Sequence, residues 1–536
     1  MNIMGIHTGH DASVSIVSNG RLISNISVER LAKKKKYRVL SKEAIEYALK
    51  KANLTIDDID CIALSDYTKD DASHIFKIFN EKGTPIIGTS QTLFGNKYSQ
   101  ITGTILGKDL DVYIIAHHTS HAASAYYTSN FDEAMCFSLD ASRGNVRANS
   151  AILYGFGNKL YTKDCPGLMI GVGYSEFTES LGLGPGLIKA GSLMGLASYG
   201  NPSKDVVNNI DKYIKESIFS LETKTTSYVK YYKDLFKKWD IDPFIKRNKS
   251  FKTMTTIAAN IQYIFEKSIL SVVNNINNKN KDNEEIVNLC LSGGSFLNCN
   301  VNSLIKNESK FKNIHHFPAC TDDGIALGAA LFVAHTIFDE PRSKYSIKDI
   351  SYCGIEYEYV EPDYDAVAKL IADGKIVGWF MGASECGPRA LGNRSILADP
   401  RNFHNRELIN FSIKRREWFR PLAPSVLEEE CSKWFDFDGI SPYMLYTAKV
   451  LKPELLPAIT HIDGTARMQT VNEETNPAYY KLIKKFYEIT GIPMVLNTSL
   501  NGMDEPILET EEDAMEFFKK SSLDAMVISG KLYTKE

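Results

Sequence analysis

Strand-like and helical runs alternate along most of the chain, and this alternation is the feature that most restricts its fold. The amino terminus predicts a β-meander with polar residues in its first turn. Its three strands are expected at Ile3–Ile6, Ala12–Val17 and Leu22–Ser27. Further runs are helical at 42–52, extended at 59–64, and extended at 112–116 with a helix from His117. The pattern predicts a layered α/β architecture.

The length, composition and net charge of the chain restrict the functions that it can have. At 536 residues the chain is long enough for several domain-sized units. A hydrophobic content of 43% and a charged content of 24% are typical of folded globular proteins. The formal net charge is −3, so no overall basic field favours non-specific nucleic-acid binding. Any anionic ligand must therefore be bound by local clusters.

Cysteine usage and hydropathy indicate the compartment. The nine cysteines are scattered and never have Cys-x-x-Cys spacing, which predicts reduced thiols. No basic and apolar leader opens the sequence, and no run approaches the roughly 18–20 apolar residues that span a bilayer. We therefore expect a cytoplasmic protein with no membrane partner.

Two composition changes indicate the domain organisation. Residues 202–285 predict a largely helical insertion ending in an Asn/Lys-rich segment at 274–283, expected to be an exposed loop. A second change near 339–359 predicts a domain boundary, with units 1–345 and 346–536. No period of 20–50 residues recurs, which disfavours a solenoid.

Two histidines and two aspartates occupy positions that an α/β fold can bring together. His117 and His121 are four residues apart, which places both imidazoles on one face of a helix. Asp140 and Asp322 follow apparent strand ends, where carboxylates face the crevice of the sheet. Singly, the histidines are compatible with a solvated face and each aspartate with a cap or turn. Together, these donors suit Fe(II), Mn(II) or Zn(II).

A polar turn and a basic run lie near the amino terminus. His10 and Asp11 follow a glycine in the first turn, and a turn role explains Asp11. For His10, on a loop where nothing requires a histidine, we expect a catalytic or substrate-contacting role. The run Lys33–Lys36 is expected to be a solvated helix end.

A second glycine turn separates a predicted strand from a predicted helix. Gly293 and Gly294 lie between an extended run at 286–291 and a helical run at 296–305. Backbone N–H groups and a helix dipole at such a turn can bind an anion or a nucleotide ribose. The turn is not a Walker A motif, because the Gly-Lys-[Ser/Thr] sequence is missing.

Arginine and lysine residues are concentrated in the carboxy-terminal third. Several lie beside glycine or proline and near aromatic residues. Fixed guanidinium groups of this kind favour a phosphate-binding pocket, and a basic surface patch is the alternative. The candidate ligands of phosphate are Arg389, Lys414, Arg420, Arg467, Asn497 and Ser499.

Taken together, the motifs resemble those of the NodU-type O-carbamoyltransferases over nearly the whole chain. Each motif is modest alone, and the set is highly specific. The matching stretches are His10–Asp11, Val28–Arg30, His117–Ala122, Met194–Gly200, Gly293–Asn298, Asp322–Ala330, Gly387–Ser395, Lys414–Glu417, Phe419–Pro421, Asp463–Arg467 and Asn497–Ser499.

This resemblance implies a fold and a reaction. It implies an amino-terminal domain of the actin-like ATPase (ribonuclease H-like) superfamily and an α+β YrdC-like carboxy-terminal domain. Members of the family form carbamoyl adenylate from carbamoyl phosphate and ATP in the YrdC-like domain. They transfer the carbamoyl group to a hydroxyl in the other domain. Carbamoyl phosphate and ATP with Mg are therefore the expected co-substrates.

The resemblance also implies residue roles. The ligands of iron, or of another divalent transition metal, would be His117, His121, Asp140 and Asp322. The contacts to the adenylate at the transfer site would be Gly293, Gly294 and Asn298. The basic and polar set of the carboxy-terminal third would hold carbamoyl phosphate and nucleotide phosphates. His10, with Asp11 beside it, is our candidate for removing the proton of the acceptor hydroxyl.

Two departures from the family pattern bear on the acceptor. The family usually has Asp-Gly-x-Gly-Glu where this chain has Asp140-Ala141-Ser142-Arg143-Gly144-Asn145, and commonly Gly-Lys where this chain has Gly191-Ser192. We therefore expect a small-molecule hydroxyl acceptor (natural product, sugar, nucleoside or nucleotide) without naming it. A homodimer is compatible with the sequence.

Two other functions stay open. A tRNA threonylcarbamoyl transferase-like enzyme would share the ancestral fold and should show a basic RNA-binding face. A non-catalytic actin-like ATP-binding protein would not need the arginine-rich second domain.

Overall fold

The computed structural model describes residues 1–65, 98–141, 149–168, 170–219, 250–280 and 282–535. Residues 142–145, which carry most of the first departure from the family pattern, lie outside the described residues. So do residues 220–249 of the expected helical insertion.

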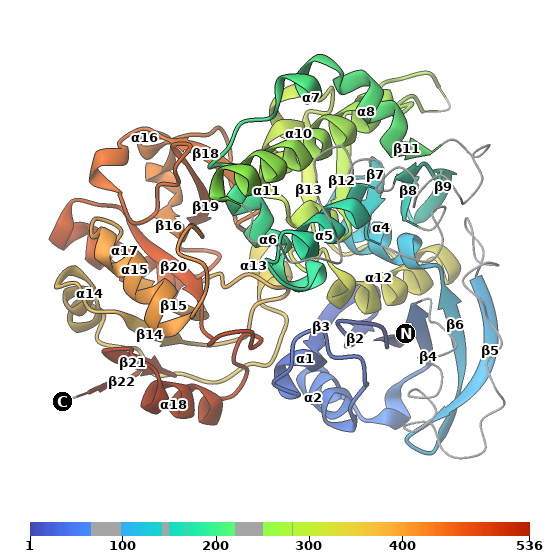
Figure 1. Ribbon diagram of the computed structural model, residues 1–536. Coiled ribbons are helices and arrows are strands. Elements are labelled where there is room, and N and C mark those ends of the chain that lie inside the picture. The colour runs from blue at the N-terminus through green and yellow to red at the C-terminus, as the bar shows by residue number, and fades with distance from the viewer. Residues whose placement is uncertain (66–97, 142–148, 169, 220–249, 281, 536) are drawn as a thin grey trace.

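Two sheets form the amino-terminal part of the molecule (Figure 1), and they share a strand order over five strands, with β5 as an additional antiparallel edge strand in the first. In each sheet, parallel strands extend a three-stranded antiparallel meander. The first sheet has the order β3-β2-β1-β4-β6-β5, with β1 Asn2–His7, β2 Ser13–Ser18, β3 Arg21–Ser27, β4 Cys61–Ser65, β5 Tyr98–Ile105 and β6 Lys108–Ile115. The second has the order β9-β8-β7-β12-β13, with β7 Glu133–Leu139, β8 Ser150–Phe156, β9 Lys159–Asp164, β12 Asn288–Ser292 and β13 Asn313–His316. The predicted β-meander is confirmed.

Helices form three layers around these sheets. Between the sheets lie α4 (His117–Thr128), which contacts β7, β8 and β12, and α12 (Ile325–Phe332), which contacts β1, β2 and β4. The helix predicted from His117 is thus confirmed. Helix α2 (Lys42–Ala52) packs on β2 and β3. Helices on the far side of the second sheet are α5 Ile170–Ser180, α6 Gly186–Ala197, α10 Phe251–Asn275 and α11 Cys299–Glu308.

The two central helices approach each other closely through small residues. A Cβ atom on Gly328 of α12 would lie 1.8 Å from the backbone oxygen of Ser120 in α4, so only glycine fits there. Ala122 of α4 and Ala329 of α12 are also fully buried in this part of the core. The first turns of α4 therefore lie against the segment that leads into α12.

The carboxy-terminal part contains a nine-stranded mixed sheet of order β17-β18-β19-β16-β20-β15-β14-β21-β22. Helices α14 (Tyr364–Ala372) and α17 (Pro477–Thr490) pack together against β14, β15, β16 and β20 over a large apolar core. The strands are β14 Val377–Phe380, β15 Arg394–Ala398, β16 Ala423–Leu427, β17 Phe435–Asp436, β18 Tyr446–Val450, β19 Thr465–Val471, β20 Met494–Ser499, β21 Ala525–Ile528 and β22 Lys531–Thr534. The other α-helices and strands of the described residues are α1 Val28–Leu31, α7 Lys204–Asn208, α8 Ile210–Ser217, α13 Ile347–Ser351, α15 Phe403–Leu408, α16 Cys431–Trp434, α18 Glu511–Lys520, β10 Gly167–Leu168 and β11 Ile218–Phe219.

Two expectations for the amino-terminal part need correction. The helix expected at 296–305 is split into a 3₁₀ turn at Gly294–Leu297 and α11, because the Asn298 side chain accepts from the Val301 N–H and starts a new helix. The Asn/Lys-rich segment is only partly exposed, because the buried Asn278 amide donates to the Ile286 carbonyl.

Three further expectations concern the fold class, the domain boundary and membrane-spanning helices. Mixed α/β sheets bear out the predicted class, and the domain boundary at 345/346 stays a prediction. Among the described residues, no helix combines the length and the hydropathy needed to cross a membrane.

We expect Gly328→Ala to lower the free energy of unfolding by about 1–3 kcal/mol, because the added methyl group must push α12 away from α4. Gly195→Ala in α6 is the matched helical control, since its Cβ would meet Pro421 at 3.4 Å, an ordinary contact. Thermal and denaturant unfolding of both variants measures the difference. Equal stability of the two variants would contradict this account of the helix contact.

Candidate functional site

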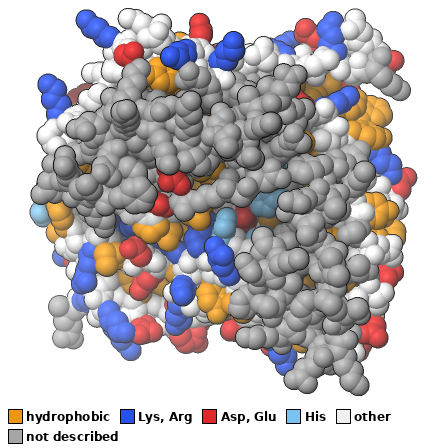
Figure 2. Space-filling view, turned by 45° about the vertical axis from the view of Figure 1, so that its right-hand side comes forward, with side chains coloured by type: hydrophobic (Ala, Val, Ile, Leu, Met, Phe, Trp, Pro, Cys, Tyr) orange, Lys and Arg blue, Asp and Glu red, His pale blue; other side chains and the backbone are white. Residues whose placement is uncertain are grey.

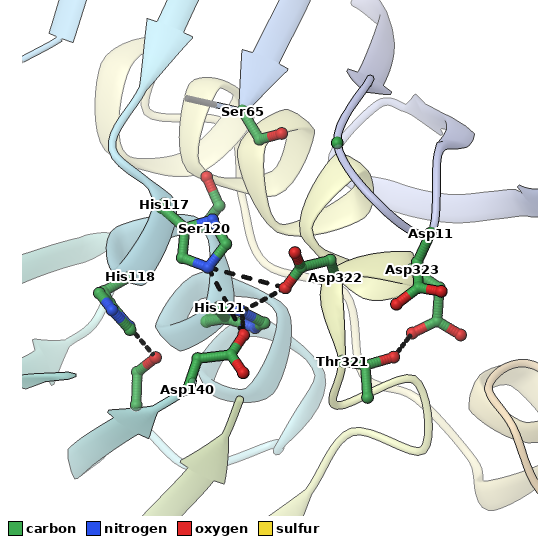
Figure 3. Close-up of polar contacts among 12 residues, drawn as sticks. Asp11, Ser65, His117, His118, Ser120, His121, Asp140, Thr321, Asp322 and Asp323 are labelled. Carbon is green, nitrogen blue, oxygen red and sulfur yellow. Dashed lines mark hydrogen bonds and ion pairs between the residues drawn. The ribbon is translucent and has the colours of Figure 1, made fainter. Parts of the chain in front are cut away.

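Four side chains from distant segments converge beside the central helices (Figure 3). His117 and His121 lie in the first turns of α4, Asp140 follows β7, and Asp322 opens the 3₁₀ turn before α12. One ligand atom of each residue lies within 4.8 Å of the others. His121 Nε2 is 3.2 Å from Asp322 Oδ1 and 3.4 Å from Asp140 Oδ2. The structure therefore brings together the four residues that sequence spacing selected.

Helix geometry separates these histidines from their neighbour. His118 points away from the cluster, and its Nδ1 lies 2.7 Å from Ser138 Oγ (Figure 3). His117 and His121 face the carboxylates because four residues make slightly more than one helical turn. Consecutive histidines therefore have different environments.

A half-buried carboxylate, Asp140, and a buried one, Asp322, face the imidazoles of this cluster. Desolvation opposes ionisation of Asp140, but His117 and His121 keep its pKa well below the ordinary range. Asp322 is buried, and His10 and His117 keep its pKa low. Burial alone would lower the pKa of His121, but both aspartates raise it to about 9. A divalent transition-metal ion, which suits imidazole and carboxylate donors, can supply the same positive charge in place of protons. The donor set therefore fits a metal ion.

His10 lies directly beside this cluster. Its Nδ1 is 3.3 Å from Asp322 Oδ2 and 3.4 Å from Asp11 Oδ2, and Asp322 raises the pKa of His10 to about 9. The ammonium group of Lys36 lies 2.5 Å from Asp11 Oδ2. The expectation of a solvated Lys33–Lys36 run is therefore wrong at Lys36, because the buried Asp11 carboxylate requires a counter-ion. No local signal in a run of four lysines distinguishes that one.

A cavity of about 400 Å³ joins this cluster to the carboxy-terminal sheet. His10, Asp140 and Asp322 line its wall on the amino-terminal side. Figure 2 shows histidine side chains beside lysine and arginine side chains near the centre of one face of the molecule. The cavity wall also includes all six candidate phosphate ligands, Arg389, Lys414, Arg420, Arg467, Asn497 and Ser499.

Among the described residues, Arg389, Arg467 and Lys414 on the carboxy-terminal wall of this cavity form no ion pair with a carboxylate. The Nε atoms of Arg389 and Arg467 are buried and make no hydrogen bond with any described residue. Lys414 donates to neutral oxygens, among them Ser499 Oγ at 3.1 Å and the Asn501 carbonyl at 3.1 Å. Burial, followed by the charge of Arg467, lowers the pKa of Arg389 to about 9. These groups are therefore arranged to receive an anionic ligand.

Arg420 differs from the other cations because it also contacts the amino-terminal part. Its Nη1 is 3.3 Å from Ser192 Oγ in α6 and 3.9 Å from Glu417 Oε2. In the second departure from the family pattern, Gly191 therefore lines the cavity and Ser192 contacts Arg420.

Only part of the glycine turn lies on the cavity wall. Gly294 and Asn298 line the cavity, whereas Gly293 does not. Gly293 has φ +96°, and a Cβ there would lie 2.2 Å from the Leu139 carbonyl oxygen, so the turn itself requires glycine. Asn298 exchanges two hydrogen bonds with Gln262 besides capping α11. The role of these residues at an adenylate stays a prediction.

Two further cavity residues follow the selected ones at a spacing of two; Arg416 belongs to a motif that the sequence singled out, whereas Asn501 was missed. Arg416 lines the cavity beyond Lys414, with its Nε held 2.8 Å from Asn410 Oδ1. Asn501 lines it beyond Ser499. The clustering of polar residues in these loops was the available signal.

Comparisons with known proteins find relatives along the whole chain. The family profile described as Carbamoyltransferase N-terminus matches residues 2–331, and the one described as Carbamoyltransferase C-terminus matches residues 368–535. An uncharacterised protein of Synechocystis sp. is 33% identical over 100% of this chain and 97% of its own length. Nodulation protein NolNO of Sinorhizobium fredii is 31% identical over 98% of this chain and 79% of its own. The 3'-hydroxymethylcephem-O-carbamoyltransferase of Amycolatopsis lactamdurans is 26% identical over 100% of this chain and 99% of its own.

We expect anaerobically purified protein to carry about one transition-metal ion per chain, and the double variant His117→Ala/His121→Ala to lose it, because two of four donors are gone. Elemental analysis measures both. The matched control is His118→Asn, which changes the adjacent histidine of the same helix and keeps a group able to bond Ser138. Unchanged metal content in the double variant would rule out the assignment, as would equal loss in the control.

Proposed function

The chain belongs to the carbamoyltransferase family, and from that premise we propose that it is an ATP-dependent O-carbamoyltransferase acting on a hydroxyl group of a small-molecule acceptor. The observation that carries the proposal is a single cavity whose wall combines the His10, Asp140 and Asp322 side chains with the unpaired cations of the carboxy-terminal sheet. Such a cavity suits a reaction in which an anionic donor is activated and then passed to a nucleophile.

The fold supports a division of labour between two domains. We propose that residues 1–345 form an actin-like, ribonuclease H-like transfer domain, and the repeated strand order of the first two sheets supports this. Residues 346–536 are then the YrdC-like domain that forms the adenylate, and the nine-stranded sheet with its basic cavity wall supports that role.

Adenylate formation would use the positively charged side chains on the carboxy-terminal wall of the cavity. Carbamoyl phosphate, ATP and one water give carbamoyl adenylate, orthophosphate and pyrophosphate. Arg389 and Arg467 have unpaired guanidinium N–H groups that can hold phosphate oxygens in a bidentate manner. Lys414, fixed by Ser499 and Asn501, adds a point charge beside them. These contacts would stabilise the charge that builds up on the phosphates.

Transfer to the acceptor would use the residues around His10. The acceptor oxygen bonds to the carbamoyl carbon, AMP leaves, and the hydroxyl proton needs a base. Nδ1 of His10 is held by Asp11 and Asp322, and its Nε2 makes no hydrogen bond with the described residues, so Nε2 is our candidate base. Cation binding by Asp322 would offset that carboxylate and let the pKa of His10 fall toward its ordinary value.

His117, His121, Asp140 and Asp322 would hold Fe(II) or another divalent metal. When bound, such an ion supplies Lewis-acid stabilisation of oxygen atoms that gain negative charge. Asp322 has a double role, because its Oδ1 faces His117 and His121 while its Oδ2 faces His10. Asp322 would therefore fix the position of His10 relative to the metal ligands His117 and His121.

We expect the two half-reactions to fail separately. His121→Ala should release pyrophosphate from carbamoyl phosphate and ATP within about threefold of the wild-type rate while forming at least about 100-fold less carbamoylated acceptor. Arg389→Lys should lower pyrophosphate release by at least about 30-fold, because lysine keeps the charge and loses the bidentate geometry. Synthetic carbamoyl adenylate should partly restore product formation in Arg389→Lys.

The matched control for the second variant is Arg401→Lys. Arg401 makes a bidentate pair with Asp399, from Nε to Oδ1 and from Nη2 to Oδ2, and lies outside the cavity wall. It should leave both signals within about twofold of wild type. Parallel loss of both signals in His121→Ala and Arg389→Lys, with folding intact, would defeat the two-site mechanism.

A further inference from the structure

The loop that carries Arg389 folds around one buried carboxylate. Glu385 is 1% exposed, and its Oε1 is the centre of this loop. Three backbone N–H groups donate to that oxygen at 2.8–2.9 Å, those of Leu391, Asn393 and Arg394. We call residues 385–394 the Arg389 loop. Its turn at 387–390 lines the cavity and lies outside these three bonds.

The amino-terminal part of the molecule supports that turn through three segments. A Cβ atom on Gly387, which has φ +90°, would lie 2.4 Å from the Pro318 carbonyl oxygen, so the turn comes this close only with glycine. Arg389 Nη2 donates to the Leu297 carbonyl at 3.2 Å. Arg30, in α1, donates from Nη2 to the Gly387 carbonyl at 2.7 Å. The conformation of the Arg389 loop therefore depends on residues outside the carboxy-terminal sheet.

A buried ion pair fixes the other end of the Arg30 guanidinium group. Arg30 is 5% exposed, and its Nη1 lies 3.3 Å from Oε2 of Glu509, which is also buried. The second oxygen of Glu509 accepts from the hydroxyl of Ser384 at 2.5 Å, directly before the Arg389 loop. Burial opposes the charge of Arg30, but Glu509 and Glu385 raise its pKa above the ordinary value. One charged group from α1 thus holds both the start and the turn of the loop.

Helix α1 is also bonded to the segment of the candidate base. Glu29 Oε2 accepts from the backbone N–H of Lys36 at 2.8 Å. The Lys36 ammonium group pairs with Asp11, the neighbour of His10. A helix of four residues therefore connects the turn of the candidate base with the turn that presents Arg389.

On this geometry, and resting on the proposed function, we propose that Arg30 is a positioning residue for adenylate formation. It comes from the amino-terminal part and keeps the Arg389 loop in the conformation that presents the Arg389 guanidinium group to a phosphate. Small displacements of a binding group cost much of the rate. A loop that depends on α1 in this way activates the donor only where the transfer site is in place. The water-sensitive intermediate then forms beside the site that uses it.

A direct contact between Arg30 and a phosphate is the alternative, because Arg30 also lines the cavity. The two roles differ in their dependence on Arg389. A residue that acts through Arg389 loses its effect when Arg389 is changed, whereas a residue that binds phosphate itself keeps its effect. A double-mutant cycle between Arg30 and Arg389 separates the two roles.

The first experiment measures carbamoyl-phosphate-dependent pyrophosphate release by the full-length protein. Arg30→Met, which removes the guanidinium group and keeps a long side chain, should lower kcat/KM for carbamoyl phosphate by at least about 20-fold. Arg30→Lys, which keeps one charged donor, should lower it by only about fivefold. Both variants should form product from synthetic carbamoyl adenylate within about threefold of the wild-type rate, which a general loss of structure would not allow.

The matched control is Arg342→Met. Arg342 likewise donates from both Nη atoms, to the Phe131 carbonyl at 2.6 Å and to the Tyr126 carbonyl at 2.9 Å, and it lies outside the cavity wall. Its pyrophosphate release should stay within about twofold of wild type. An equal loss in this control would show that Arg30 acts through stability alone and would overturn the proposal.

The second experiment is the cycle itself. In the Arg389→Lys background, Arg30→Met should lower pyrophosphate release by less than about threefold. A larger loss there, or unchanged release in folded Arg30→Met, would overturn the positioning role. If Arg30→Met does not fold, the cycle is run with Arg30→Lys, whose loss should fall below about twofold beside Arg389→Lys, and a larger loss has the same meaning. Absence of carbamoyl-phosphate-dependent pyrophosphate release in wild type would instead count against the proposed function.

Discussion

The close approach of α4 and α12 is the contact on which the amino-terminal site depends. Gly328 has no side chain, so the two helices meet at the Ser120 backbone. That contact sets the first turns of α4 beside the 3₁₀ turn that carries Asp322. A helix pair held one side chain farther apart would leave His121 and Asp322 beyond the 3.2 Å that now separates them. Packing between the sheets is therefore a condition for the chemistry at their edge.

Buried charge is handled differently on the two sides of the cavity. On the amino-terminal side, imidazoles and Lys36 face carboxylates and can form ion pairs with them. On the carboxy-terminal side, burial lowers the pKa of both Arg389 and Arg467, and the charge of Arg467 lowers that of Arg389 further. Concentrating like charge in a low-dielectric site costs folding free energy, and an anionic ligand offsets that cost when it binds. Preorganised cations of this kind need little rearrangement during reaction.

Two asparagines on the cavity wall differ in how many of their polar side-chain atoms form hydrogen bonds within the protein. Asn298 uses its oxygen to cap α11 and its amide in an exchange with Gln262, so its polar groups all have partners within the protein. Asn497 has a saturated amide nitrogen and an unused oxygen. Both residues occur in motifs that resemble one family, yet of the two only Asn497 has a buried polar side-chain atom without a hydrogen bond to a described residue.

By itself, the sequence determined the local geometry of this protein. Alternating runs predicted the meander and the α/β class, and the spacing of His117 and His121 predicted one helical face, because these patterns depend only on residues near each other in the chain. The ion pair of Lys36 with Asp11, the two-sided contact of Asp322 and the direction of the Asn497 amide were decided by the tertiary structure. Each of them arises where segments from different parts of the chain meet, as when Asp322 lies between His10 and His121. Local periodicity contains no information about which buried group will find a partner, and only the packed fold decides that.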